Sequence, residues 1–185
     1  MKQAFPAIET KRLTLVNTTA DDARFILALY KDPLVCRYLY DEEPFTSINQ
    51  AKEWIDWHEY PEDYGRNRWI IRKKETAIPI GTCGFDQWDI VNHVAEIGFD
   101  LWHGEWGKGY MSEALTAAID SGFRNMGLNR IQAFVALENT ASCRLLERLG
   151  FEREGIFREK HFFQGEYYDH YIYSLLKKDW KKGGL

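Results

Sequence analysis

The sequence has few cysteines and no long hydrophobic run, and both absences limit the class of protein it can encode. Its 185 residues include three cysteines, Cys36, Cys83 and Cys143, without a C-x-x-C spacing. This odd number predicts neither a disulfide framework nor a zinc site, and it is typical of a reducing compartment. No stretch approaches the roughly 18 to 20 apolar residues of a membrane helix, and the N-terminus lacks the apolar run of a signal peptide. We therefore expect a cytoplasmic protein without a membrane partner or a metal site.

The sequence also lacks an excess of positive over negative charge. Lys and Arg number 24 against 28 Asp and Glu, which gives a net charge of −4. A protein that neutralises many phosphates is normally basic, so we expect no nucleic-acid partner. Hydrophobic residues make up 45% of the chain, enough to bury a sizeable core and to exclude a disordered chain. No repeat or linker interrupts residues 1–185, so we expect a single domain.

Hydrophobic periodicity predicts the order of the elements. Period-2 and apolar segments predict seven strands, at residues 12–17, 68–72, 78–88, 93–102, 130–137, 151–163 and 167–176. Helical spacing and cap residues predict four helices, at 23–30, 48–58, 108–126 and 139–149. This order mixes antiparallel hairpins with one β-α-β crossover. It predicts an α+β protein and not a doubly wound parallel sheet.

A glycine-rich turn follows the fourth expected strand. The segment Trp102-His-Gly-Glu-Trp-Gly-Lys-Gly-Tyr110 opens directly onto a long helix. Glycines let backbone amides approach a ligand closely, and a helix start adds unpaired N–H groups that suit a phosphate. A P-loop is excluded because Trp102 stands at its first glycine, and a dinucleotide motif because Ser112 replaces its third. A tight turn without a ligand remains the alternative on these residues alone.

Four motifs in order resemble one family. Gly107 and Gly109 fit the acetyl-CoA motif R/Q-x-x-G-x-G/A, although Gly104 stands where Arg or Gln is usual. Asn139, with Ser142 three positions on and Gly-Phe at 150–151, resembles a second signature. The segments 9–15 and 154–169 extend the similarity over nearly the whole chain. The sequence thus resembles the GCN5-related N-acetyltransferase (GNAT) superfamily, and its ending resembles the branch that acetylates ribosomal-protein N-termini.

The resemblance implies a fold and a binding mode. The GNAT fold has a mixed, mostly antiparallel central sheet of about seven strands, with flanking helices and a splayed central strand pair. Acetyl-CoA is the implied co-substrate, with its diphosphate on the amides of the turn and its pantetheine arm along a strand in the splay. The residues that this implies for cofactor binding are Phe99, Leu101, Gly104, Trp106, Gly107, Lys108, Gly109, Tyr110, Asn139 and Ser142.

Three residues are candidates for the chemistry. Glu96 lies on the polar side of an alternating strand, and related enzymes place a catalytic glutamate in such a strand. His161 is the second candidate base, because imidazole has the better-matched intrinsic pKa. The family's usual tyrosine acid is replaced by Leu146, so Ser142 is the implied hydrogen-bond donor to the leaving sulfur. A surface carboxylate, a packed hairpin histidine and an ordinary first-turn serine are the alternative interpretations.

The resulting hypothesis is an N-acetyltransferase that moves an acetyl group directly from acetyl-CoA to a primary amine. The acceptor is a protein N-terminus of the ribosomal type or a small-molecule amine, and Asp41, Glu42 and Glu43 would suit a cationic one. A non-catalytic regulatory module that binds acetyl-CoA is the alternative. A homodimer is left open.

Overall fold

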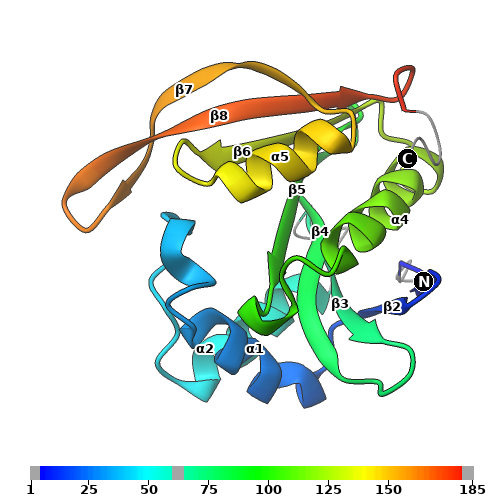
Figure 1. The fold of residues 1–185 in the computed structure, drawn as a ribbon, viewed down its shortest axis with the longest axis vertical. Coiled ribbons are helices and arrows are strands. Elements are labelled where there is room, and N and C mark those ends of the chain that lie inside the picture. The colour runs from blue at the N-terminus through cyan, green and yellow to red at the C-terminus, as the bar shows by residue number, and fades with distance from the viewer. Residues whose placement is uncertain (1–4, 60–64, 181–185) are drawn as a thin grey trace.

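One mixed β-sheet runs through the described residues, 5–59 and 65–180, of the computed structural model (Figure 1). Its eight strands lie in the order β1-β2-β3-β4-β5-β6-β8-β7. Their bounds are β1 Ile8–Glu9, β2 Leu13–Asn17, β3 Asn67–Lys73, β4 Pro79–Asp89, β5 Val94–Leu101, β6 Arg130–Ala136, β7 Glu152–Phe163 and β8 Glu166–Leu176. All neighbours are antiparallel except β5 and β6. The α+β class is confirmed, and the eighth strand is β1, whose two residues are too few to show a period.

Helices cover both faces of the sheet (Figure 1). They are α1 Ala23–Lys31, α2 Ile48–Glu59, α4 Tyr110–Arg124 and α5 Thr140–Arg148, with short 3-10 turns at Ala20–Asp22, Cys36–Tyr38 and His103–Glu105. Successive residues of β3 serve the two faces, since side chains alternate along a strand. Trp69 packs in the core with α4 and α5, whereas Ile70 packs in the core with α1 and α2.

Local sequence fixes the helix ends. α2 begins after the predicted capping box, in which Ser47 N donates to Gln50 Oε1 at 3.0 Å and Gln50 N donates to Ser47 Oγ at 3.4 Å. The prediction that α4 starts at Lys108 is wrong by two residues. Gly109 has a φ of +77°, a left-handed conformation that a right-handed helix cannot include, so α4 begins at Tyr110.

The central strands β5 and β6 separate partway along their length. β5 pairs with β4 as far as Leu101, but its parallel pairing with β6 covers only Val94–Arg130, Ala95–Ile131 and Glu96–Gln132. Beyond that point β6 stays with β8 up to Ala136. The expected splay is therefore confirmed, and the β6-facing edge of residues 97–101 has no strand partner in the described sheet.

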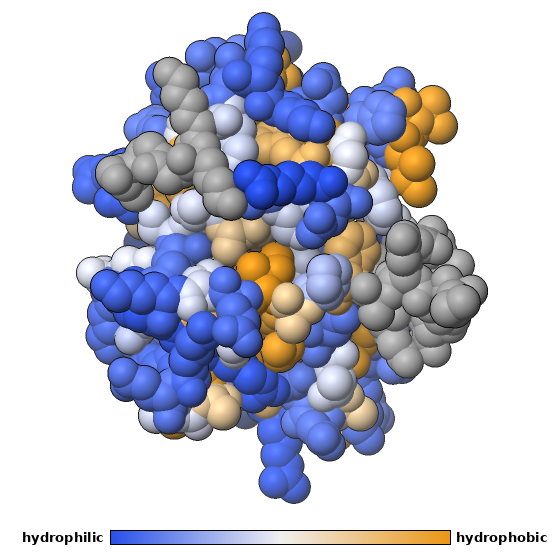
Figure 2. Space-filling model, turned by 90° about the vertical axis from the view of Figure 1, so that its right-hand side faces the viewer, coloured by the Kyte–Doolittle hydropathy of each residue, from blue (hydrophilic) through white to orange (hydrophobic). Residues whose placement is uncertain are grey.

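The β7–β8 hairpin extends past the body of the molecule (Figure 1). The segment after α1 contacts it: Tyr40 stacks on Tyr168 with ring centroids 3.8 Å apart, and Gln164 Nε2 donates to Glu43 Oε2 at 3.2 Å. The face on the right of Figure 1 is mostly hydrophilic, with a hydrophobic strip at its centre (Figure 2). Within the described ranges, no helix is long and apolar enough to cross a membrane.

Candidate active site

Glu96 lies where the parallel strands separate. Its neighbours on the same face of β5 are Gly98 and Asp100, as the alternation predicts, and this face looks toward α1 because Tyr30 Oη donates to Asp100 Oδ2 at 2.9 Å. Glu96 is half-buried, and its carboxylate makes no hydrogen bond or ion pair with any residue in the described ranges. Burial raises the pKa of Glu96 to about 7; the negative charge of Asp86 adds to this, and nearby Lys160 opposes it. A carboxyl group with this pKa can exchange a proton near neutrality.

His161, the second candidate base, lies on the β7–β8 hairpin. Its ring centroid is 4.8 Å from that of buried His170. Burial lowers the pKa of His161, and Asp41 opposes the shift while Lys160 adds to it. Asp41 and Lys160 also act on Glu96, so the structure brings both candidate bases into the same electrostatic neighbourhood.

The segment after α1 places acidic and aromatic side chains beside these groups. Burial and the adjacent Asp41 carboxylate raise the pKa of Glu42 to about 7. Tyr40 contacts the edge of the His170 ring at a centroid distance of 5.9 Å, in addition to its stack on Tyr168. Carboxylates and aromatic rings both attract ammonium groups, so this side of the sheet suits a cationic molecule.

The glycine turn has the backbone geometry of an anion site. Gly107 and Gly109 both have left-handed φ values, +74° and +77°, which glycine adopts without strain. The first amide of α4 that donates to the preceding turn is that of Glu113, to Gly109 O at 3.2 Å. The amides of residues 110–112 therefore project from the helix end. A Cβ at Gly107 would meet nothing within 4 Å, so open space lies over the turn. These residues fit a diphosphate.

Side chains of the turn are largely engaged with the turn itself. Lys108 Nζ donates to Gly104 O at 2.7 Å and lies 3.0 Å from Glu105 Oε2, so its charge is partly compensated. Trp106 Nε1 donates to Leu101 O at 2.7 Å. Arg12 Nη1 donates to Lys108 O at 2.9 Å, and its guanidinium lies over the Tyr110 ring. Arg12 thus fixes the turn against the start of β2, a contact that the sequence did not reveal.

The second family signature forms the start of α5. Asn139 caps the helix, accepting a hydrogen bond from Ser142 N at 3.2 Å. Ser142 is half-buried, and no contact joins it to Glu96 or His161 in the part of the chain that is described. Cys143 and Leu146 are buried in the core, which leaves no acidic side chain at the position of the usual tyrosine.

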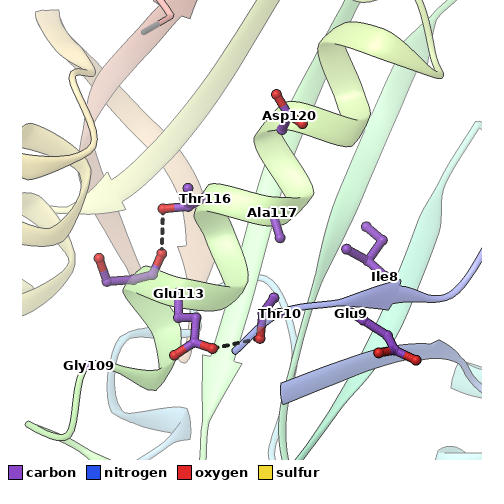
Figure 3. A pocket seen from close by; sticks show the side chains of 9 residues that line it. Ile8, Glu9, Thr10, Gly109, Glu113, Thr116, Ala117 and Asp120 are labelled. Carbon is purple, nitrogen blue, oxygen red and sulfur yellow. Dashed lines mark hydrogen bonds between the residues drawn. The ribbon is translucent and has the colours of Figure 1, made fainter. Parts of the chain in front are cut away.

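A pocket of about 620 Å³ lies between β1 and α4 and reaches Gly109 at the end of the glycine turn (Figure 3). Thr10, Glu113 and Asp120 are among its lining residues, and Thr10 Oγ1 donates to Glu113 Oε1 at 2.6 Å. Glu9 adds a further carboxylate to the wall. Each of these carboxylates is paired with a cation: Glu113 with Arg12 at 2.6 Å, Glu9 with Lys74 at 3.0 Å and Asp120 with Arg124 at 3.1 Å.

The sequence interpretation missed Arg68, on β3. Its guanidinium donates to Asp86 Oδ2 at 3.3 Å and to Asp100 Oδ2 at 3.0 Å, on the face of the sheet that carries Glu96. A signal was present, because an aspartate in a strand as apolar as 94–102 requires a buried partner. The sequence spacing does not show which cation is the partner of this aspartate.

A splayed parallel strand pair with a carboxylate at its fork, followed by a glycine turn at a helix start, defines the acetyltransferase class. Residues 12–152 match the family model described as an acetyltransferase (GNAT) domain. The chain belongs to the GNAT acetyltransferase family and is an N-acetyltransferase.

Its relatives include N-acetyltransferases, and those named with an acceptor differ in that acceptor. The chain is 42% identical to the uncharacterized N-acetyltransferase p20 of Bacillus licheniformis, covering 92% of this chain and 96% of the relative. It is 38% identical to the ribosomal protein uS5-alanine N-acetyltransferase of Escherichia coli, over 49% of this chain and 47% of that protein. A spermidine N-acetyltransferase from Vibrio cholerae, solved with CoA and spermine, superposes with a TM-score of 0.81 at 26% identity, covering 92% of this chain and 98% of that one.

Proposed function

We propose that this protein transfers an acetyl group from acetyl-CoA to a primary amine that arrives as a cation, with Glu96 as the general base. The observation that carries the proposal is the position of Glu96 at the fork of β5 and β6, half-buried and free of hydrogen bonds with the described residues. The CoA-bound structure of the Vibrio cholerae relative supports the choice of donor.

Acetyl-CoA, when bound, supplies an acetyl thioester. The amides of Gly107, Lys108, Gly109 and Tyr110, with that of Gly104, would hold its diphosphate. The amide of Trp106, also expected there, instead donates to His103 O at 3.2 Å. The unpaired edge at Phe99 and Leu101 would pair with the amide-bearing arm, in the way an extended ligand adds to a sheet edge. The carbonyl of Leu101 already accepts the Trp106 indole, so the remaining groups of this edge would make the pairing. Asn139 and Ser142, at the start of α5, would complete the binding residues.

Glu96 would take a proton from the ammonium of the acceptor. With a pKa of about 7 its carboxylate is half ionised at neutral pH, close to the optimum for a general base. As the C–N bond forms and the C–S bond breaks, the Ser142 hydroxyl would donate a hydrogen bond to the departing sulfur. Thiolate is a tolerable leaving group, so a stronger acid is not required.

His161 remains the alternative base. Its pKa is lowered by burial, so it is neutral and able to accept a proton at pH 7. Glu96 is preferred because it lies at the fork of β5 and β6, whereas His161 pairs with Tyr168 in the β7–β8 hairpin, beyond a break in register between Phe157 and His161.

The acceptor is tested by thiol release from acetyl-CoA with spermidine, a small monoamine and a peptide with an N-terminal alanine. Two of these acceptor classes are those named for relatives. We expect release well above buffer hydrolysis with at least one cationic amine, together with a rise in Tm on addition of acetyl-CoA. A Tm rise without release would indicate a module that only binds acetyl-CoA. The absence of both would overturn the proposal.

A further inference from the structure

Two glycines and an arginine are aligned across three strands beneath the fork. Arg68 on β3 pairs with Gly84 on β4, and Gly84 pairs with Gly98 on β5. Paired residues share a face, so the Arg68 side chain crosses the sheet along a path without side chains. A Cβ at Gly98 would overlap Arg68 Nη1, and a Cβ at Gly84 would overlap the β3 backbone. Glycine is therefore required at position 84 by the close approach of the β3 backbone, and at position 98 it leaves the space that the Arg68 guanidinium occupies.

The guanidinium ends over Gly98, between Glu96 and Asp100 on the same face of β5. Its two terminal nitrogens donate to Asp86 and Asp100, at 3.3 and 3.0 Å, and only 10% of the side chain is exposed. Asp100 is further fixed by Tyr30 Oη, which is itself buried. Asp86 and Asp100 are thus compensated by one buried cation.

Glu96 is the carboxylate of this face that the arginine does not bond. It lies directly opposite Asp86 in the β4–β5 pairing, and it has no hydrogen bond with a described residue. Without the arginine, three acidic groups would share this side of β4 and β5 with no buried cation beside them. Burial and mutual repulsion would then keep Glu96 protonated at neutral pH.

Resting on the proposed role of Glu96, we propose that Arg68 is its positioning residue: laid across Gly84 and Gly98, it compensates Asp86 and Asp100 so that Glu96 can exchange a proton with the acceptor. Arg68 acts through the electrostatics of the sheet and does not touch the substrate.

Several charged groups surround Glu96 and enter any test by pH. Lys160 on β7 and Arg68 on β3 lower the pKa of Glu96, Lys160 by more, whereas Asp86 on β4 and Asp41 in the segment before α2 raise it. Asp100, on the same face of β5, has its own pKa raised by burial although Arg68 opposes the shift. His58 of α2, whose Nε2 lies 4.0 Å from Asp86 Oδ1, has its pKa lowered to about 4 by burial, so it is neutral where Glu96 titrates. Gln132, opposite on β6, carries no charge.

The test compares R68M with R72M. Arg72 is on the same face of β3 and bonds the buried carboxylate of Asp22, so both variants break a comparable ion pair. The midpoint of Glu96 is measured by carbon-13 NMR of glutamate-labelled protein, assigned by the signal lost in E96Q, and compared with the acid limb of kcat/KM. Removal of a positive charge disfavours the carboxylate, so R68M should raise the midpoint by about one pH unit.

R72M should lower Tm without moving that midpoint. R68K, which keeps the charge, should shift it by less than half as much as R68M. R68Q, close in length and able to donate to one carboxylate, should repeat the R68M shift and replaces R68M if that variant does not fold. An unchanged midpoint in the neutral variants, or an equal shift in R72M, would overturn the proposal. The NMR midpoint does not depend on turnover. A wild type without activity would therefore overturn the proposed function, whereas the NMR titration would still decide the inference about Arg68.

Discussion

Glu96 on β5 pairs with Gln132 on β6, and this is the last of the three residue pairs that join the two parallel strands. Before this pair, β5 is held on both sides by strand pairing; after it, β5 is paired on the β4 side alone. The pair therefore fixes the backbone of Glu96 at the apex of the fork, next to the edge of β5 that has no strand partner among the described residues. This relationship separates Glu96 from other carboxylates of the sheet as a candidate base.

Glutamine at position 96 should abolish most of the activity. E96Q keeps size and polarity but cannot accept a proton, so we expect kcat/KM for the amine to fall by roughly 10²- to 10⁴-fold with the affinity for CoA unchanged. Thiol release and calorimetry with CoA measure the two quantities. H161Q is the matched variant and should lose less than about tenfold. The reverse order of losses would assign the base to His161.

The same substitution should stabilise the protein at alkaline pH. Burial raises the pKa of Glu96 from 4.5 to about 7, so ionisation disfavours the folded state, and stability is lost as the pH rises from about 4.5 to 7. E96Q removes this cost. The difference in unfolding free energy should grow to about 2–3 kcal/mol in favour of E96Q above pH 7.

Glu154 provides the control of opposite sign. Hydrogen bonds from Arg130 and Ser174 lower its pKa to about 2, so its contribution is present above pH 4.5 and is lost as the pH falls toward 2. E154Q should therefore destabilise at pH 7 and approach the wild type in acid. Urea titrations at pH 3, pH 5 and pH 8 measure both differences, the first pair for E154Q and the second for E96Q, and an E96Q curve parallel to the wild type would contradict the burial argument.

Valine at Gly107 should remove CoA binding without unfolding the chain. A β-branched residue at its φ of +74° is strained by roughly 1–2 kcal/mol and would fill the open space over the turn. Gly127, after α4, also has a left-handed φ, +70°, with nothing within 4 Å of a Cβ. G127V should show similar strain in Tm but normal CoA affinity by calorimetry. Equal affinities in the two variants would count against the turn as the binding site.

Substitutions of Ser142 and Asn139 should distinguish a role in catalysis from a role in capping α5. S142A removes a hydrogen bond to a developing negative charge, so kcat should fall roughly 10- to 100-fold with little change in Tm. N139A removes the cap of α5 and should cost about 1 kcal/mol of stability. Chemical denaturation and steady-state kinetics distinguish the two. A normal kcat in S142A would show that the serine is an ordinary first-turn residue.

Much of the fold was predictable because its signals are local. The alternation along 94–102 placed Glu96 and Asp100 on one face, and the Ser47 capping box marked the start of α2. The two-residue strand β1 escaped prediction because it is shorter than any period. The start of α4 was misplaced because glycines at 107 and 109 are compatible with several backbone conformations until the turn is built.

The candidate site was predictable only in part. Glu96, the glycine turn and Asn139 belong to motifs that can be recognised from the spacing of residues in the sequence. Arg68 stands 28 positions before Glu96, and no local sequence pattern indicates its role. The contacts of Tyr40 with the β7–β8 hairpin are likewise not indicated by any local pattern.

The sequence by itself determined the period of each element, the caps and the bare amides of the turn, since each depends on residues a few positions apart. Tertiary structure decided where β5 and β6 part, and that Arg68 crosses two glycines to reach Asp100. It also decided that Glu96, unlike Asp86 and Asp100, makes no hydrogen bond with a described residue. The physical reason is that ion pairs in a sheet join residues on neighbouring strands. The number of residues between two strands in the sequence does not show whether the strands are neighbours in space.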